Sequence, residues 1–167
     1  DVTVKTQPDQ QPSRQFCTVS NGSGSIPWNN VTNVRVDCIN IYTVSATVNG
    51  NTGPVTLINT VTPGNNGGFV PTPSNPPNQD LKTANAGGGN VTFQPQYISS
   101  SSQVQISSKP ESQTCLVLNG QVNNISTDIS NVVVNCSDTP LTLTVYNNTT
   151  GRNGNNERAQ ICIQGAR

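Results

Sequence analysis

Apolar and polar residues alternate along short stretches of this chain, which is the period of a β-strand with one buried face. Valine and isoleucine provide most of the apolar positions. The predicted strands are residues 41–48, 55–58, 90–93, 103–106, 115–118 and 129–136. Residues 63–77 hold too much proline, glycine and asparagine for a strand, so a loop is expected there, and residues 86–89 predict a flexible turn. The fold class expected from this pattern is all-β.

The cysteines reveal an internal repeat. Cys17 and Cys38 have the same separation as Cys115 and Cys136, and the flanking residues match as well. Residues 16–22 match 114–120, and residues 31–38 match 129–136. Further upstream, Val2, Val4 and Pro8 match Val104, Ile106 and Pro110 if a few extra residues near 11–14 are allowed. Agreement in cysteines, Asn-Gly turn and alternating valines together indicates a true repeat.

Each copy reads as strand, turn and strand, with the turn at an Asn-Gly pair. We expect Cys17 to bond to Cys38 and Cys115 to Cys136, either across one strand pair or between two sheets. A bridge closing a loop of this length stabilises the fold by roughly 3 kcal/mol. The alternatives are four reduced, buried thiols, or zinc, although the chain has no Cys-x-x-Cys and no histidine. Disulfides predict an oxidising location: periplasm, cell surface or outside the cell.

The repeat also predicts the domain organisation. Residues 1–38 would be the late strands of an incomplete module, residues 39–138 a complete module, and residues 139–167 the opening hairpin of another. In the last segment Leu141, Leu143 and Val145 alternate with threonines, and Ala159, Ile161 and Ile163 alternate on a second strand. About seven short strands per module predict an immunoglobulin-like β-sandwich with one disulfide per module.

Segments 2–8, 17–24, 30–38 and 42–48 together resemble an immunoglobulin-like repeat that occurs in tandem in large bacterial surface and secreted proteins. The resemblance covers residues 1–60 and 103–138 and is weakest in the middle loops and in the tail. It implies a role as a stalk, fibre or adhesin module and implies no enzymatic activity.

An incomplete module at each end suggests self-assembly, because each piece would expose an apolar face and a free sheet edge. We expect the carboxy-terminal hairpin of one copy to complete the amino-terminal half-module of the next, a heterologous head-to-tail contact. The expected interface residues are Val2, Val4, Leu141, Leu143, Val145, Ile161 and Ile163. Two alternatives stay open: the two pieces pair within one chain, or the chain is an excised part of a longer repeat protein.

Cys162 is a fifth cysteine with no counterpart in the repeat. It would lie on the strand 159–163, facing away from Ala159 and the two isoleucines. An intermolecular disulfide and a buried free thiol are both compatible with this position.

Charge and composition exclude several functions. Only 10% of the residues are charged and the formal net charge is zero, so nucleic-acid binding is not expected. No apolar run is long enough for membrane insertion. The absence of histidine removes histidine-based catalysis, and the carboxylates are scattered. No catalytic residue, metal site or cofactor is expected, and the protein is not expected to be an enzyme.

Two surface features complete the sequence picture. Trp28 could contact a sugar or a receptor, although packing over the disulfide loop is the stronger expectation. Candidate glycosylation sequons begin at Asn21, Asn30, Asn90, Asn124 and Asn147, and many such sequons arise from composition alone.

The expected function is that of a structural subunit of an extracellular fibre, filament or sheath, located outside the cell or on its surface. Its expected partners are copies of itself, with a cell-surface or glycan ligand as a further possibility. The alternative is an adhesin stalk or ligand-binding module from a longer surface repeat protein. A stalk segment would continue in both directions in its gene.

Overall fold

The protein is described by a computed structural model that places residues 1–8, 14–26, 28, 30–70 and 78–139. This part of the chain is all-β and contains no helix, hence none long and apolar enough to cross a membrane. The expected fold class is therefore confirmed at the level of an all-β fold.

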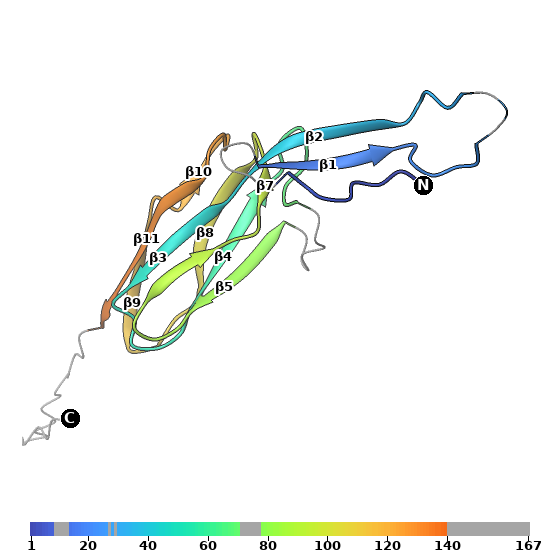
Figure 1. The fold of residues 1–167 in the computed structure, drawn as a ribbon. Coiled ribbons are helices and arrows are strands. Elements are labelled where there is room, and N and C mark those ends of the chain that lie inside the picture. The colour runs from blue at the N-terminus through green and yellow to red at the C-terminus, as the bar shows by residue number, and fades with distance from the viewer. Residues whose placement is uncertain (9–13, 27, 29, 71–77, 140–167) are drawn as a thin grey trace, which may run out of the picture.

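Two four-stranded sheets build the larger part of the structure (Figure 1). One has the order β10-β8-β4-β5 and the other β6-β3-β11-β9. The strand bounds are β3 Val44–Asn49, β4 Val55–Thr62, β5 Gln79–Ala84, β6 Gly89–Thr92, β8 Ser101–Ser108, β9 Gln113–Leu118, β10 Gln121–Val122 and β11 Ile129–Asp138. We call residues 44–139 the complete module.

A single hydrophobic core lies between these two sheets. Val44, Leu57 and Val132 are fully buried in it, and strands β3, β4 and β11 show the in-and-out burial that their sequences predict. Phe93 and Ile125, from the connecting segments, complete the core. Each buried valine or leucine contributes roughly 1.5–3 kcal/mol relative to an exposed one.

The complete module is closed by pairing its first strand with its last. β3 runs parallel to β11, with Ala46 opposite Val132 and Val48 opposite Val134. β11 also pairs with β9 on its other edge, in antiparallel register. β11 therefore has neighbours on both edges, and its inward valines are fully covered.

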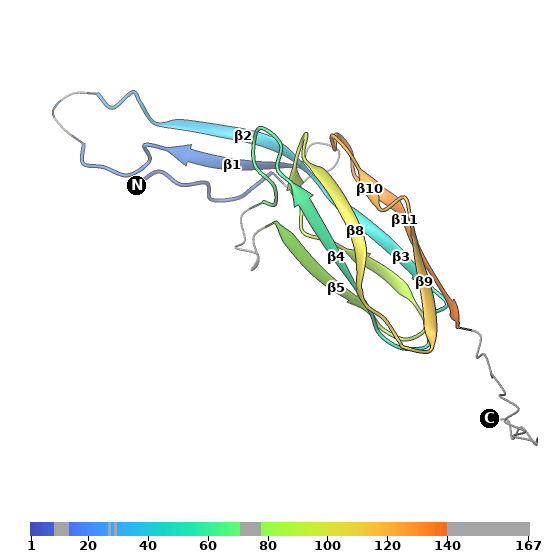
Figure 2. The same ribbon diagram turned by 180° about the vertical axis from the view of Figure 1, so that it is seen from behind.

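A second unit projects from one end of the complete module, along its long axis (Figures 1 and 2). It is a ribbon of β1 (Gln15–Ser20) and β2 (Arg35–Tyr42), paired antiparallel, with residues 1–8 beside it. We call the described residues of 1–42 the half-module. β2 is followed, after Thr43 alone, by β3, so the chain passes from ribbon to sheets almost without interruption.

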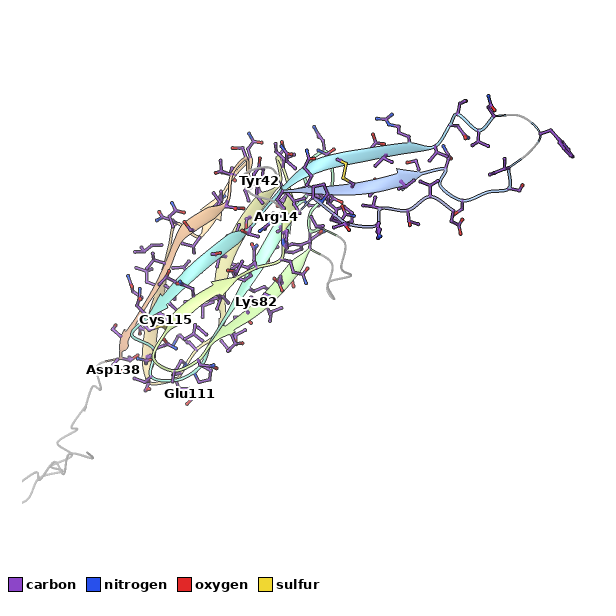
Figure 3. All side chains as sticks on the ribbon, in the orientation of Figure 1. Arg14, Tyr42, Lys82, Glu111, Cys115 and Asp138 are labelled. Atoms are coloured by element: carbon purple, nitrogen blue, oxygen red, sulfur yellow. A yellow bond between two sulfur atoms is a disulfide. The ribbon has the colours of Figure 1, made fainter. Side chains whose placement is uncertain are left out.

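The junction between the half-module and the complete module is packed and hydrogen-bonded. Ile41 and Tyr42 at the end of β2 pair with the short strand β7 (Gln96–Tyr97). The rings of Phe16 and Tyr97 meet edge to face at 6.3 Å, and burial raises the pKa of Tyr97 above its usual value. Figure 3 shows Arg14 and Tyr42 at this junction.

Each unit contains one disulfide bond, Cys17–Cys38 in the half-module and Cys115–Cys136 in the complete module. In both bonds the two cysteines are opposite each other on adjacent antiparallel strands, with their Cα atoms 4.0 Å apart. Of the two arrangements left open by the sequence, the structure has the bond across the strand pair. Two such bonds are typical of proteins from oxidising compartments.

The structure differs from the sequence expectation in several strands, and the short strands β7 and β10 are not predicted by the sequence pattern. The segment 41–48, expected as one strand, is divided at Thr43, and β4 continues to Thr62, beyond the expected end at 58. β5 was not expected, because Gln79–Ala84 is largely polar. Its inward position is occupied by Asp80, which accepts a 2.7 Å hydrogen bond from the Gln94 N–H and lies 3.5 Å from the Lys82 ammonium group. A satisfied carboxylate can therefore occupy a buried strand position.

Gln113 joins three segments at the end of the complete module far from the junction. Its carboxamide accepts a hydrogen bond from the Thr52 N–H at 2.8 Å and donates to the Gly50 carbonyl at 2.9 Å and to the Asp138 carboxylate at 3.2 Å. The side chain is almost fully buried. It therefore fixes the β3–β4 turn against the end of β11.

We predict that Gln113→Ala lowers the free energy of unfolding by about 1–3 kcal/mol, because the Thr52 N–H, the Gly50 carbonyl and the Asp138 carboxylate lose their hydrogen bonds to the almost fully buried carboxamide. Urea denaturation followed by circular dichroism measures the change. The matched control is Gln105→Ala on the exposed face of β8, expected within about 0.5 kcal/mol of the unmodified protein. Equal effects of the two substitutions would contradict the role assigned to Gln113.

The disulfides give a second prediction. Replacing both Cys115 and Cys136 by alanine is expected to lower the free energy of unfolding of the complete module by about 3 kcal/mol, because the unfolded chain gains freedom. Replacing Cys17 and Cys38 instead should leave the main unfolding transition in place, since that bond lies outside the two-sheet core. The reverse order of effects in a urea titration would contradict this assignment.

Candidate strand-acceptor site

The half-module repeats several hydrogen bonds of the late strands of the complete module at equivalent positions. The Asn21 and Asn119 side chains have equivalent bonds to Asn33 and Asn131 at 3.1 and 3.0 Å, and both asparagines have φ of 55°. Three backbone N–H to carbonyl hydrogen bonds also have equivalents in the other copy. The Val2–Gly22 bond corresponds to Val104–Gly120, the Gln15–Pro8 bond to Gln113–Pro110, and the Ile41–Arg14 bond to Thr139–Ser112. The sequence repeat is therefore also a structural repeat.

The two copies differ in what covers their inner face. Val36 is 53% exposed and Val2 is 48% exposed, whereas their counterparts Val134 and Val104 are 0% and 3% exposed. Val34 is half-buried where its counterpart Val132 is fully buried. In the complete module β3 and β4 provide this cover, and no described residue takes their place over the half-module.

The uncovered inner face is hollowed. A cleft of about 700 Å³ lies between the amino-terminal segment and the loop that joins β1 to β2, and its lining includes Val2, Ile26, Val31 and Val34. A shallower hollow of about 370 Å³ continues over Val4, Gln7, Cys17 and Val19. We call the two together, with the free edge of β2, the acceptor groove.

β2 has a free edge along this groove. Among the described residues, its second edge pairs only at Ile41 and Tyr42, with β7, whereas β11 pairs along its length with β3. The outer edge of β1, by contrast, is bonded to Gln7. The Gln7 carboxamide accepts a hydrogen bond from the Cys17 N–H at 2.7 Å and donates one to the Cys17 carbonyl at 3.0 Å. Free N–H and carbonyl groups on an apolar ribbon favour pairing with another strand.

The far tip of the half-module exposes two large apolar side chains. Ile26 is 89% exposed and Trp28 is fully exposed. The expectation that Trp28 packs over the disulfide loop is therefore wrong. The physical reason is that the tip projects from the ribbon and none of the described strands reaches it (Figure 3).

The other residues singled out in the sequence have the following places. Val2 and Val4 line the acceptor groove. The sequon asparagines Asn21, Asn30, Asn90 and Asn124 are all exposed. Leu141, Leu143, Val145, Asn147, Ile161, Cys162 and Ile163 lie outside the described residues. Within the described residues, no three acidic, cysteine or histidine side chains group together as a metal site would require.

Sequence reasoning missed the β2 side of the groove, which consists of Val31, Val34 and Val36. The signal was present in the repeat, because the alignment places these residues on Ile129, Val132 and Val134, the core-facing positions of β11. The sequence repeat predicts Val2 and Val4 as interface residues of the half-module and no residue of β2. The open edge of β2 follows from the parallel pairing of β3 with β11, the counterpart of β2, and this pairing leaves no local signal in the sequence.

The chain was compared with known proteins at three levels. No family model, no curated protein and no solved structure matches it.

Proposed function

We propose that this chain is a structural subunit of an extracellular fibre, in which immunoglobulin-like modules follow one another and a strand hairpin of one copy completes the half-module of the next. The observation that carries the proposal is the acceptor groove. It has the backbone geometry of a finished module but leaves the inner faces of Val2 and Val36 uncovered.

The occupant in this proposal is the segment 141–163 of a second copy. Its alternating residues resemble the first two strands of the complete module, which are the strands that the half-module lacks. Covering each exposed valine would add roughly 1.5–3 kcal/mol to the stability of the joint, and backbone pairing along β2 would add direction and specificity.

A fibre follows from the polarity of this contact. The half-module, which carries the groove, lies at one end of the described structure, and β11 ends at the opposite end (Figures 1 and 2). A donor at one end and an acceptor at the other form a heterologous interface, which propagates into an open filament when the rotation between copies does not close. The disulfides suit such a fibre outside the cell.

An adhesin stalk is the second candidate, and the passage from β2 to β3 through Thr43 alone favours it. Such a direct connection makes a rod from tandem modules of one long chain. The two candidates differ in what fills the acceptor groove, a second copy or another part of the same protein.

We predict that the unmodified chain forms polymers in light scattering without reductant, with masses at multiples of 17.6 kDa. Val36→Asp should block the acceptor groove and Leu143→Asp should block the donor segment, so each variant alone should be monomeric. Mixed together, they should form dimers and no larger species, because one functional donor and one functional acceptor remain.

Leu116→Asp is the matched control, because Leu116 is 62% exposed on β9 and lies outside the groove. This variant should polymerise like the unmodified chain. A monomer at every concentration for the unmodified chain would contradict the fibre and favour the stalk. Polymers that persist in both aspartate variants would contradict strand complementation.

A further inference from the structure

The complete module shows how a donor hairpin would sit in the acceptor groove, residue by residue. Within the complete module, β3 pairs with β11 in parallel, with Val44 opposite Ile129 and Val48 opposite Val134. β4 pairs with β8 in antiparallel register, with Leu57 opposite Ile106. These two registers form a template for the missing half.

The template transfers to the half-module because the two copies share their hydrogen bonds. The bond from the Val2 N–H to the Gly22 carbonyl, at 2.8 Å, corresponds to the bond from the Val104 N–H to the Gly120 carbonyl, at 2.7 Å. It fixes residues 2–4 as the counterparts of 104–106. Likewise, the disulfide positions fix residues 31–38 as the counterparts of 129–136.

The entry point of the donor is fixed by Thr139. Its N–H bonds to the Ser112 carbonyl at 2.7 Å, as the Ile41 N–H bonds to the Arg14 carbonyl at 3.1 Å. The chain therefore leaves the complete module in the way that the half-module leads into β3. The next residues, 141–145, read Leu-Thr-Leu-Thr-Val, which matches Val-Ser-Ala-Thr-Val of β3 with one residue fewer at the break.

We infer that the segment 141–163 of a second copy occupies the acceptor groove in the register of β3 and β4, which brings Cys162 of that copy directly opposite Thr3. This inference rests on the proposed function. Strand 141–145 runs parallel to residues 31–36, with Leu143 opposite Val34. Strand 159–163 runs antiparallel to residues 2–4, with Ile161 opposite Val4.

The position of Cys162 follows from the inward side chains. We place Ile161, the central one of the three inward residues of its strand, at the position of the fully buried Leu57, so Cys162 takes the place of Ile58. Ile58 is the cross-strand partner of Gln105, and Gln105 corresponds to Thr3. Directly opposed residues of an antiparallel pair have Cα atoms about 4.5–5.5 Å apart, which a disulfide can span.

The donor in this register belongs to another copy rather than to the same chain. Pro140 alone separates Thr139 from Leu141, and one residue advances the chain by about 3.8 Å. Thr139 follows the end of β11, opposite to the end that carries the groove (Figures 1 and 2). β11 alone has 10 residues, which span about 33 Å in a strand. Leu141 therefore cannot reach Val31 of its own chain.

The register is tested with Thr3→Cys in the full chain, which places a thiol opposite the native Cys162. After mild oxidation, a non-reducing gel should show most of the chains in a ladder of covalent multimers that collapses on reduction. Thr3→Cys combined with Cys162→Ser should give no ladder. These two results together support the inference.

Two further variants test the register against its neighbours. Lys5→Cys and Asp1→Cys place the thiol two residues to either side, on the same face of the segment. A ladder from either variant without one from Thr3→Cys would overturn the register, while polymers in light scattering would leave the proposed function intact. In the Thr3→Cys variant, a faster-migrating monomer with the introduced thiol bonded to Cys162 of its own chain would overturn the second copy as the donor. Absence of polymers would overturn the inference and the proposed function together.

Discussion

The parallel pairing of β3 with β11 is the interaction on which the rest of the structure depends. It brings the first and last strands of the complete module side by side in one sheet, whose inward valines Val132 and Val134 are completely buried. Among the described residues, β2 has a second neighbour only at Ile41 and Tyr42, and Val36, the counterpart of Val134, is largely exposed. The two repeats thus differ, within the described residues, in whether strands equivalent to β3 and β4 cover the inner face.

The module reaches a stable fold with few large apolar residues. Its core is built mainly from valines, and only 31% of the whole chain is hydrophobic. A core of this kind gains less from burial than one rich in leucine and phenylalanine, so cross-links and buried polar contacts carry more of the stability. The cross-strand disulfide of the complete module and the Gln113 carboxamide meet this need at the same end of the module. Figure 3 shows Cys115 and Asp138 together there.

The sequence predicted those parts of the fold that depend on local pattern. The repeat, the all-β class and most strands follow from alternating valines and from Asn-Gly turns such as Asn119-Gly120. The sequence does not predict β5, because one of its buried positions is Asp80. The burial of this carboxylate depends on a hydrogen bond from the Gln94 N–H, which lies in another segment. The sequence also does not predict the pairing of Val44 with Ile129, because parallel strands far apart in the chain leave no local signal.

The candidate site was predictable in part. The repeat identifies Val2 and Val4, which match Val104 and Ile106, whereas the exposed edge at Val36 requires the sheet order. The general tendency of tryptophan to be buried predicts that Trp28 packs against the fold. Its full exposure results from its position at the tip of the ribbon, beyond the described strands.

Amide hydrogen exchange of residues 34–37 at rising protein concentration tests the central claim most directly. If a strand from a second copy pairs with the free edge of β2, the amides in this range whose N–H points away from β1 gain protection as the concentration rises and lose it again on dilution, whereas those that point toward β1 are already paired. The amides of β11 are protected at every concentration, because β3 already covers them. Protection of residues 34–37 that stays low at all concentrations would contradict the account.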